Sequence, residues 1–238
     1  TFEYPGAEKP ALKDVSFKAA PGETTAIIGG TGSGKSTLLK LISRFYDASS
    51  GVVLVNGVDV KEMPIQFLRE KIGLVPQKAV LFTGTVRENI LFGNEQASEE
   101  EIIHAVKVAQ AYDFVTQMKE GFDSIIAQGG TNVSGGQKQR LSIARALVRK
   151  PEVYLFDDSF SALDFKTDAK LRAALKPETK ESTVFIVAQR VSTVMDAERI
   201  IVLDEGEVAG IGTHQELMDT CEVYQEIVSS QLSEEESA

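Results

Sequence analysis

A glycine-rich stretch carries the clearest chemistry in this chain: Gly29-Gly30-Thr31-Gly32-Ser33-Gly34-Lys35-Ser36. It follows an apolar run at residues 25–28 and opens a helical pattern, so the predicted order is strand, glycine loop and helix. Glycines let successive backbone N–H groups turn toward an anion, and the N-terminus of the next helix adds further N–H groups. A chance glycine turn is the alternative, but the strand and helix on its two sides favour a phosphate-binding loop.

In such a loop the lysine, Lys35, reaches the β- and γ-phosphates of a nucleotide, and the hydroxyl of Ser36 can ligate Mg²⁺. Asp157 follows an apolar strand at residues 153–156, and the carboxyl ends of parallel strands face the phosphate site. A carboxylate there can hold Mg²⁺, whereas the alternative is an N-cap, a position that Asp also favours. The four apolar residues before it favour the metal role. The loop residues that we assign to nucleotide binding are Gly30, Thr31, Gly32, Ser33, Gly34, Lys35, Ser36 and Thr37.

The elements that must position these residues alternate between strand and helix, which predicts an α/β fold with a mostly parallel sheet. We expect a P-loop NTPase core, an N-terminal antiparallel β part with strands at 15–17 and 52–55, and a helical subdomain at about 85–150. The helix after the phosphate loop is predicted to reach Tyr46. Two short helices and a frayed acidic tail, Ser233–Ala238, are predicted to end a single domain at residues 1–238.

The composition excludes several classes of protein. The chain has 238 residues, 42% hydrophobic and 25% charged, with a net charge of −10, which argues against a nucleic-acid partner or an anionic membrane surface. A single cysteine, Cys221, rules out an internal disulfide and a cysteine metal cluster. No apolar run approaches the roughly 20 residues of a membrane span, and no signal peptide is visible at the start. We assign no catalytic role to His104, and we interpret His214 as a turn or capping residue.

Two further motifs follow in order: Ser134-Gly135-Gly136-Gln137 before a helix, and Ser161-Ala162-Leu163-Asp164 after the strand that ends at Asp157. With the phosphate loop and Gln77, this ordered set resembles the ATP-binding cassette (ABC) family over nearly the whole chain. An ordinary N-cap turn is the alternative for the first motif, but we expect it to leave Gln137 unexplained.

The resemblance implies that Tyr4 stacks on adenine and that Gln77 senses Mg²⁺ and the γ-phosphate. It implies that Ser134, Gly135, Gly136 and Gln137 contact the nucleotide of the opposite subunit and that Asp164 lies at the dimer interface. Two cassettes would then enclose two ATP molecules with Mg²⁺. Residues 82–90 and 212–217 resemble exporter cassettes, which are fused behind membrane domains. We therefore expect an excised domain that works at the cytoplasmic side of a membrane with the transmembrane domains of an exporter.

Two positions depart from the family pattern. The residue after the strand aspartate is usually a glutamate that polarises the attacking water, and here it is Asp158. The usual histidine at the end of the next strand is Gln189. Residues 127–128 also differ from the Glu-Arg pair of exporters, which leaves their coupling role in doubt. Because phosphoryl transfer depends on positioning, we predict slow hydrolysis governed by Asp158, Gln189 and Gln77.

This pattern resembles one half of a heterodimeric multidrug-type exporter, whose partner cassette has the regular catalytic Glu. This chain would hold a degenerate site and lend its own signature motif to the competent one. A nucleotide-binding regulatory module that does not hydrolyse ATP is a second hypothesis. A cassette of a DNA-repair or chromosome-structure ATPase is a third, disfavoured by the acidic charge and by the absence of a long coiled coil between Lys35 and Ser134.

Overall fold

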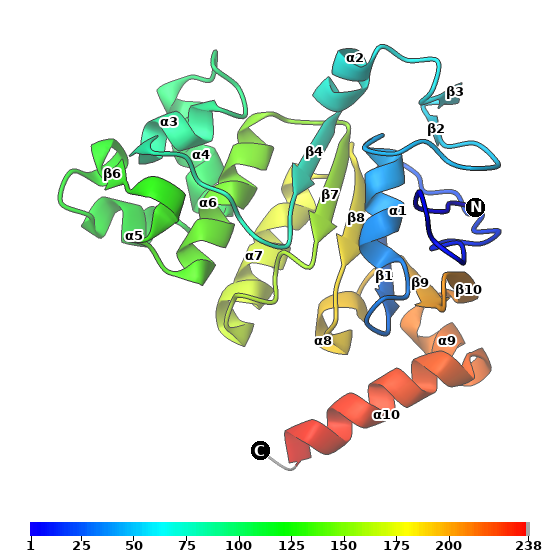
Figure 1. Ribbon diagram of the computed structural model, residues 1–238. Helices are drawn as coiled ribbons and strands as arrows, with labels where there is room; N and C mark the ends of the chain where they lie inside the picture. Colours follow the sequence, from blue (N-terminus) through cyan, green and yellow to red (C-terminus); the bar gives the residue numbers. More distant parts are fainter. Residues whose placement is uncertain (237–238) are drawn as a thin grey trace.

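The fold is built around one mixed sheet, shown in Figure 1. The structure, a computed structural model, describes the backbone of residues 1–236 and the side chains of residues 1–232. Within that part, six strands form the sheet in the order β10-β9-β1-β8-β7-β4. The strands are β1 (Thr24–Gly29), β4 (Ile72–Val75), β7 (Val153–Asp157), β8 (Thr183–Val187), β9 (Arg199–Asp204) and β10 (Glu207–Gly212).

The four pairings among β4, β7, β8, β1 and β9 are parallel, and β10 runs antiparallel to β9. Because alternate side chains point to opposite faces, Ile28 and Ile186 join the core on one face while Ile27 and Val187 join the core on the other. The register places Asp157 opposite Val187. The carboxyl ends of these strands therefore meet at one edge, as the sequence predicts, and the predicted α/β fold is confirmed.

Helices cover both faces of the sheet. On one face lies α1 (Lys35–Ile42), which ends before the predicted Tyr46. Arg44 takes a left-handed conformation, with φ of 51°, and its guanidinium donates to the carbonyl oxygens of Val60 and Met63 at 2.8 Å each. These two tertiary hydrogen bonds hold Arg44 outside the helical conformation, so the helix ends before it. The opposite face packs against α6 (Gly135–Val148) and α7 (Phe165–Glu178).

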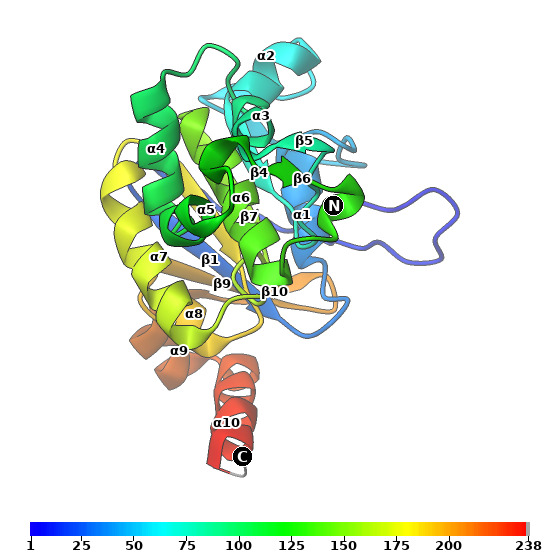
Figure 2. The ribbon, with the colours of Figure 1, turned by 90° about the vertical axis from the view of Figure 1, so that its left-hand side faces the viewer.

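The helices between residues 86 and 148 gather at the side of the sheet that ends with β4, as Figures 1 and 2 show. Ile102, Ala105, Val106 and Ala109 are buried, as their helical spacing predicts. Among these helices, α6 also contacts β4 and so joins the group to the sheet. The smaller elements here are α3 (Val86–Leu91), α4 (Glu99–Val108), α5 (Tyr112–Gln117), η1 (Gly121–Asp123), η2 (Gln128–Gly130), β5 (Gly84–Thr85) and β6 (Ile125–Ile126).

The N-terminal β part is antiparallel but smaller than predicted. A short hairpin, β2 (Leu54–Val55) and β3 (Val58–Asp59), turns at Asn56 and Gly57, whose φ values are 52° and 78°. The predicted strand at 15–17 is wrong, because in the described part of the chain these residues join no ladder. Phe17 nevertheless packs its ring 6.0 Å from that of Phe185. Its alternating pattern therefore reflects burial, not strand pairing. The short helix α2 (Ile65–Glu70) follows the hairpin.

The C-terminal region holds α8 (Val191–Val194), α9 (His214–Thr220) and α10 (Glu222–Glu236). The prediction of two short final helices is wrong for α10, which has 15 residues. The predicted frayed tail is also wrong for residues 233–236, whose backbone is helical, and its last two residues lie outside the described ones. Thr213, not His214, caps α9, and the Nδ1 of His214 instead lies 2.8 Å from the hydroxyl of Tyr224. No helix in the described part of the chain combines the length and the apolar character that a membrane span needs.

Candidate functional site

The loop between β1 and α1 has an open side and a packed side. A Cβ atom on Gly34 would lie 2.6 Å from Leu12 Cδ2 and 2.8 Å from the carbonyl oxygen of Ala11. A Cβ atom on Gly30 or Gly32 would meet no atom within 4 Å. The open side is therefore where an anion can approach the backbone N–H groups of the loop and of the first turn of α1.

Alanine substitutions should separate the two sides of the loop. Gly34→Ala is expected to lower the free energy of unfolding by roughly 2–5 kcal/mol, because a left-handed φ of 101° adds to the clash with Leu12. Gly32→Ala, at φ of 82° but in open space, is expected to cost about 1–2 kcal/mol and to weaken nucleotide binding more than stability. Urea unfolding and nucleotide titration of both variants measure this. Equal losses of stability would contradict the assignment of the two sides.

Lys35 lies across this loop. Its Nζ donates to the carbonyl oxygens of Gly29 at 2.8 Å and Gly30 at 2.7 Å. Burial lowers the pKa of Lys35, and the negative charges of Asp158 and Asp157 act in the opposite direction. The described partners of the ammonium group are neutral oxygens, so it can turn toward a phosphate at the same place.

Ser36 and Asp157 form the predicted metal pair. The Ser36 hydroxyl donates to Asp157 Oδ1 at 2.8 Å, which joins the start of α1 to the end of β7. Burial is the largest influence and raises the pKa of Asp157, while the bond from Ser36 lowers it. Both groups offer oxygen ligands, the type that Mg²⁺ takes in proteins. Together with the open space beside Gly30 and Gly32, this donor set fits a bound Mg²⁺–nucleotide.

Asp158 is the point where the three predicted catalytic side chains meet. Its Oδ2 accepts bonds from Gln77 Nε2 at 3.1 Å and from Gln189 Nε2 at 2.9 Å. Asp158 is only 6% exposed, and its φ of 47° is left-handed, a costly conformation for a residue that is not glycine. Sequence reasoning named these residues, and the structure brings them to a single oxygen atom.

Tyr4 lies beside α1. Its hydroxyl is 2.9 Å from Thr37 Oγ1, and its ring packs edge-on against the rings of Phe2 and Tyr46, with centroids 4.8 Å and 5.2 Å away. These contacts hold Tyr4 next to the phosphate loop and bring Thr37 to the same place. Stacking of this ring on adenine stays a prediction.

The signature residues Ser134–Gln137 begin α6. Ser134 and Gln137 form a reciprocal capping box, with N···O distances of 2.9 and 3.2 Å. The expectation that a capping turn would leave Gln137 unexplained is therefore wrong. Ser134 and Gly135 are exposed, and within the described residues no hydrogen bond joins this motif to residues 29–36. Contact with a nucleotide held by another subunit stays a prediction.

Asp164 caps α7. Its two carboxylate oxygens accept bonds from the backbone N–H of Thr167 at 2.9 Å and from the Thr167 hydroxyl at 2.7 Å. These bonds, the side-chain one first, lower the pKa of Asp164. The residue is exposed, so a role at a dimer interface is compatible with the cap, and it stays a prediction.

Comparison with known proteins decides the family. A family model described as ABC transporter matches residues 12–161, more than half of the chain. The chain belongs to the ABC transporter family. A solved structure of a bacterial Atm1-family ABC exporter with ATP bound superposes with a TM-score of 0.93 at 37% sequence identity, covering 97% of this chain and 40% of that one.

Among curated relatives, an uncharacterized ABC transporter ATP-binding protein of Mycobacterium tuberculosis is 49% identical over 97% of this ABC transporter chain and 40% of its own length. The uncharacterized ABC transporter ATP-binding protein YfiB of Bacillus subtilis is 47% identical, covering 100% of this chain and 41% of the relative. A putative multidrug export ATP-binding/permease protein of Staphylococcus aureus is 42% identical, and the match covers 97% of this chain and 40% of the relative. The ABC chain thus spans about 40% of the length of these relatives.

Sequence reasoning missed residues that support the ABC site from a distance. Gln139, 2% exposed in α6, donates to the carbonyl oxygen of Pro76 at 3.0 Å and so fixes the start of the Gln77 loop. A glutamine on the buried face of a helix was a signal that could have revealed it. Gln231 in α10 contacts the loop that carries Gln189, and no local pattern points to that contact.

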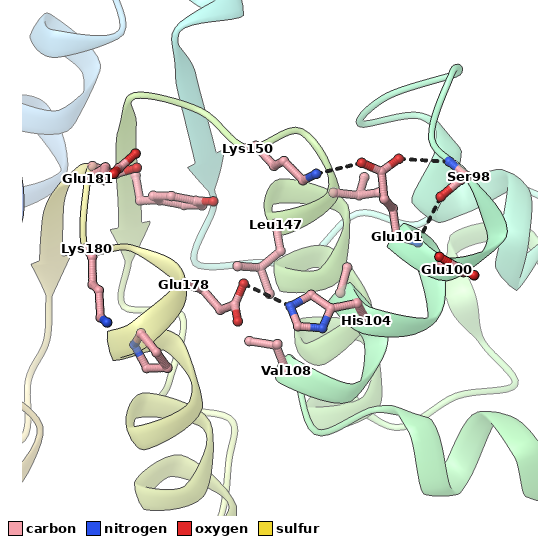
Figure 3. A pocket seen from close by; sticks show the side chains of 15 residues that line it. Ser98, Glu100, Glu101, His104, Val108, Leu147, Lys150, Glu178, Lys180 and Glu181 are labelled. Atoms are coloured by element: carbon pink, nitrogen blue, oxygen red, sulfur yellow. Dashed lines mark hydrogen bonds and ion pairs between the residues drawn. The ribbon is translucent and has the colours of Figure 1, made fainter.

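A large cavity of the ABC chain lies away from the residues of the predicted nucleotide site. Figure 3 shows this cavity of about 930 Å³, lined by α4 and by the C-terminal end of α7. Across it, His104 Nε2 lies 2.9 Å from Glu178 Oε2, and nearby Lys150 pairs with Glu101 at 2.6 Å. The side chain of His104, to which we assign no catalytic role, is 60% exposed. No predicted site residue lines the cavity, so cavity size does not identify the nucleotide site in this chain.

Proposed function

We propose that this ABC chain binds Mg²⁺–ATP and, as a dimer with a partner cassette, powers export of a substrate across a membrane. The structural neighbour is an exporter with ATP bound, and the Staphylococcus aureus relative is named a putative multidrug export ATP-binding/permease protein. The permease portion would lie in the part of such proteins that this chain does not match. We propose that the chain works at the cytoplasmic side of a membrane, as one nucleotide-binding domain with a helical subdomain at about residues 85–150.

The proposal includes slow hydrolysis at the chain's own site. The observation that carries it is the convergence of Gln77 and Gln189 on Asp158 Oδ2, at 3.1 and 2.9 Å. A general base must reach the attacking water, but this short carboxylate is buried and one of its oxygens already accepts two amide bonds. When bound, Mg²⁺ would neutralise phosphate charge, held through Ser36 and Asp157, with Gln77 close by. Lys35 and the loop N–H groups would orient the nucleotide.

The exposed signature motif supports the dimer. Ser134 and Gly135 open a 14-residue helix whose free N–H groups and positive dipole end suit a phosphate. They share no hydrogen bond with the chain's own phosphate loop within the described residues. We propose that they complete a competent site on a partner cassette that has the regular catalytic Glu.

Exposed apolar side chains near the Gln77 loop support contact with transmembrane domains. Val80, Phe82 and Phe92 are 56%, 44% and 67% exposed, and the two phenylalanine rings stack with centroids 4.5 Å apart. Arg145 fixes this segment by donating to the carbonyl oxygens of Val80 and Asn89 at 2.8 Å each. A rigid, apolar, exposed surface of this kind suits docking of another protein domain.

The test compares the chain alone with the chain and its partner cassette, measuring Mg²⁺–ATP binding and single-turnover hydrolysis. We expect the chain alone to bind ATP and the pair to hydrolyse it at the competent site about 10²-fold faster than at this chain's own site. Fast single turnover by the isolated chain would contradict a degenerate site. The alternative, a regulatory module, has the same fold but predicts ATP binding with no hydrolysis at either site.

A further inference from the structure

The last helix reaches back to the loop that carries Gln189. Gln231 Nε2 donates to the carbonyl oxygen of Gln189 at 2.6 Å, and its Oε1 accepts a bond from the backbone N–H of Val191 at 2.8 Å. The planar amide of Gln231 thus binds the backbone on both sides of Arg190. Gln231 and Gln189 are 42 residues apart in the sequence. Two bonds of this kind fix the loop as a neighbouring strand would.

The Gln231 bonds satisfy groups that the loop cannot satisfy itself. Val191 begins α8, and the first N–H groups of a helix have no partner within it. Arg190 is the N-cap residue, and its side chain makes no capping bond. Gln231 therefore does the capping from another element, and the loop depends on α10 for its position.

The loop at residues 189–191 also contacts the site on its other side. Gln189 donates to Asp158 Oδ2 at 2.9 Å. The guanidinium of Arg190 donates to the carbonyl oxygens of Ser161 at 3.1 Å and Leu163 at 3.3 Å, just before Asp164. The same three residues thus connect α10, Asp158 and the segment of the predicted dimer interface.

The support for Gln231 is firm because α10 is anchored near its start. Tyr224 is fully buried, and its hydroxyl lies 2.8 Å from His214 Nδ1. Val228, one turn later, is also buried. As Figure 1 shows, α10 then extends along the molecule beyond α9. A helix fixed at its first turns can hold a side chain further along at a defined place.

We infer that Gln231 is a positioning residue, which holds Gln189 where its amide can reach Asp158 and the γ-phosphate of a bound nucleotide. The inference rests on the proposed function, because it assumes that a nucleotide binds beside Lys35. If this inference holds, α10 regulates the site, because a partner or a change that withdraws α10 releases Gln189. The affinity for ATP should then fall, whereas the affinity for ADP, which has no γ-phosphate, should not change.

The test measures Mg²⁺–ATP and Mg²⁺–ADP affinity of the chain by equilibrium titration. Gln231→Ala is expected to lower the preference for ATP over ADP about fivefold, the size expected for loss of one or two hydrogen bonds. Gln225→Ala is the matched control. It removes a glutamine from the same helix, one that donates to the carbonyl oxygen of Met218 at 2.6 Å, and it should leave the preference unchanged.

Amide hydrogen exchange supplies a readout that needs no nucleotide. In Gln231→Ala the Val191 N–H should lose protection, while the same N–H in Gln225→Ala should keep it. If Gln231→Ala does not fold, Gln231→Glu replaces it. That variant keeps the acceptor for Val191 and loses the donor to Gln189, so it should lower the ATP preference as well.

The outcomes separate the inference from the proposed function. If the unaltered chain binds neither nucleotide, the proposed function fails while hydrogen exchange still tests the contact. If the unaltered chain prefers ATP and the Gln231 variants keep that preference, the inference fails alone. An equal loss of ATP and ADP affinity would show a general structural role and would also overturn it.

Discussion

Replacing Asp158 by Glu and Gln189 by His together is expected to raise ATP turnover at this chain's site about 10²-fold in the complex with its partner cassette. The added methylene lets the carboxylate extend past the position where Gln77 and Gln189 now bind it, at 3.1 and 2.9 Å. Histidine removes one of the two amide donors and supplies an imidazole that can contact the γ-phosphate. Single-turnover hydrolysis, with ATP affinity measured in parallel, checks the result.

Asp158→Asn combined with Gln189→His is the control for this rescue. It keeps the size of the side chain but removes the carboxylate, so turnover should not rise. Because Asp158 is 6% exposed and left-handed, the double variant must first be shown to fold and to bind ATP. If the Asp158→Glu/Gln189→His variant folds and binds ATP but its turnover is unchanged, these two residues do not cause the slow hydrolysis.

The sequence predicts those parts of the site whose positions depend on the order of strands and loops along the chain and on the parallel pairing of the strands. An apolar strand before the glycine loop and another before Asp157 place both at one sheet edge, and the structure joins Ser36 to Asp157 there at 2.8 Å. The position of Asp158 at the same edge can also be predicted, because it is the next residue after Asp157. Its shared bonds with Gln77 and Gln189 come from loops 81 and 31 residues away, so only the resemblance to a family named them in advance.

The misses have a common physical cause, which is tertiary contact overriding local pattern. Arg44 leaves the helix because its guanidinium finds carbonyl acceptors at Val60 and Met63. Phe17 alternates in burial with its neighbours yet pairs with no described strand. Gln231 looks like any polar residue of an acidic terminal helix, although its amide binds the backbone at Gln189 and Val191. No window of neighbouring residues contains such partners.

Gln137 shows the opposite difficulty, in which a local explanation and a functional one fit the same residue. Its capping box with Ser134 stabilises the start of α6 by about 1 kcal/mol without any nucleotide. The cap also fixes the exposed Ser134 and Gly135 at a helix N-terminus, the geometry that binds phosphate. The cap is therefore a reason for Gln137 at this position whichever role the motif has in a dimer.

Lys35→Ala is expected to lower Mg²⁺–ATP affinity at least about 10²-fold, since a charge-assisted hydrogen bond to phosphate is worth about 1.5–3 kcal/mol and the lysine has access to two phosphates. The reason is its place in the loop. The ammonium group is held at the carbonyl oxygens of Gly29 and Gly30, next to the open side, and burial lowers its pKa. A phosphate would supply the negative charge that its described neutral partners lack.

In Lys35→Ala the stability of the fold should change much less than the affinity for ATP. Burying an ammonium group costs free energy, so its removal should change the unfolding midpoint in urea little while ATP binding is lost. Lys40→Ala, which removes an exposed lysine from the same helix, controls for net charge and should change affinity less than about twofold. If Lys35→Ala folds and binds ATP as tightly as the unaltered chain, the glycine loop is not the nucleotide site, and the roles of Ser36, Asp157 and Asp158 lose their basis.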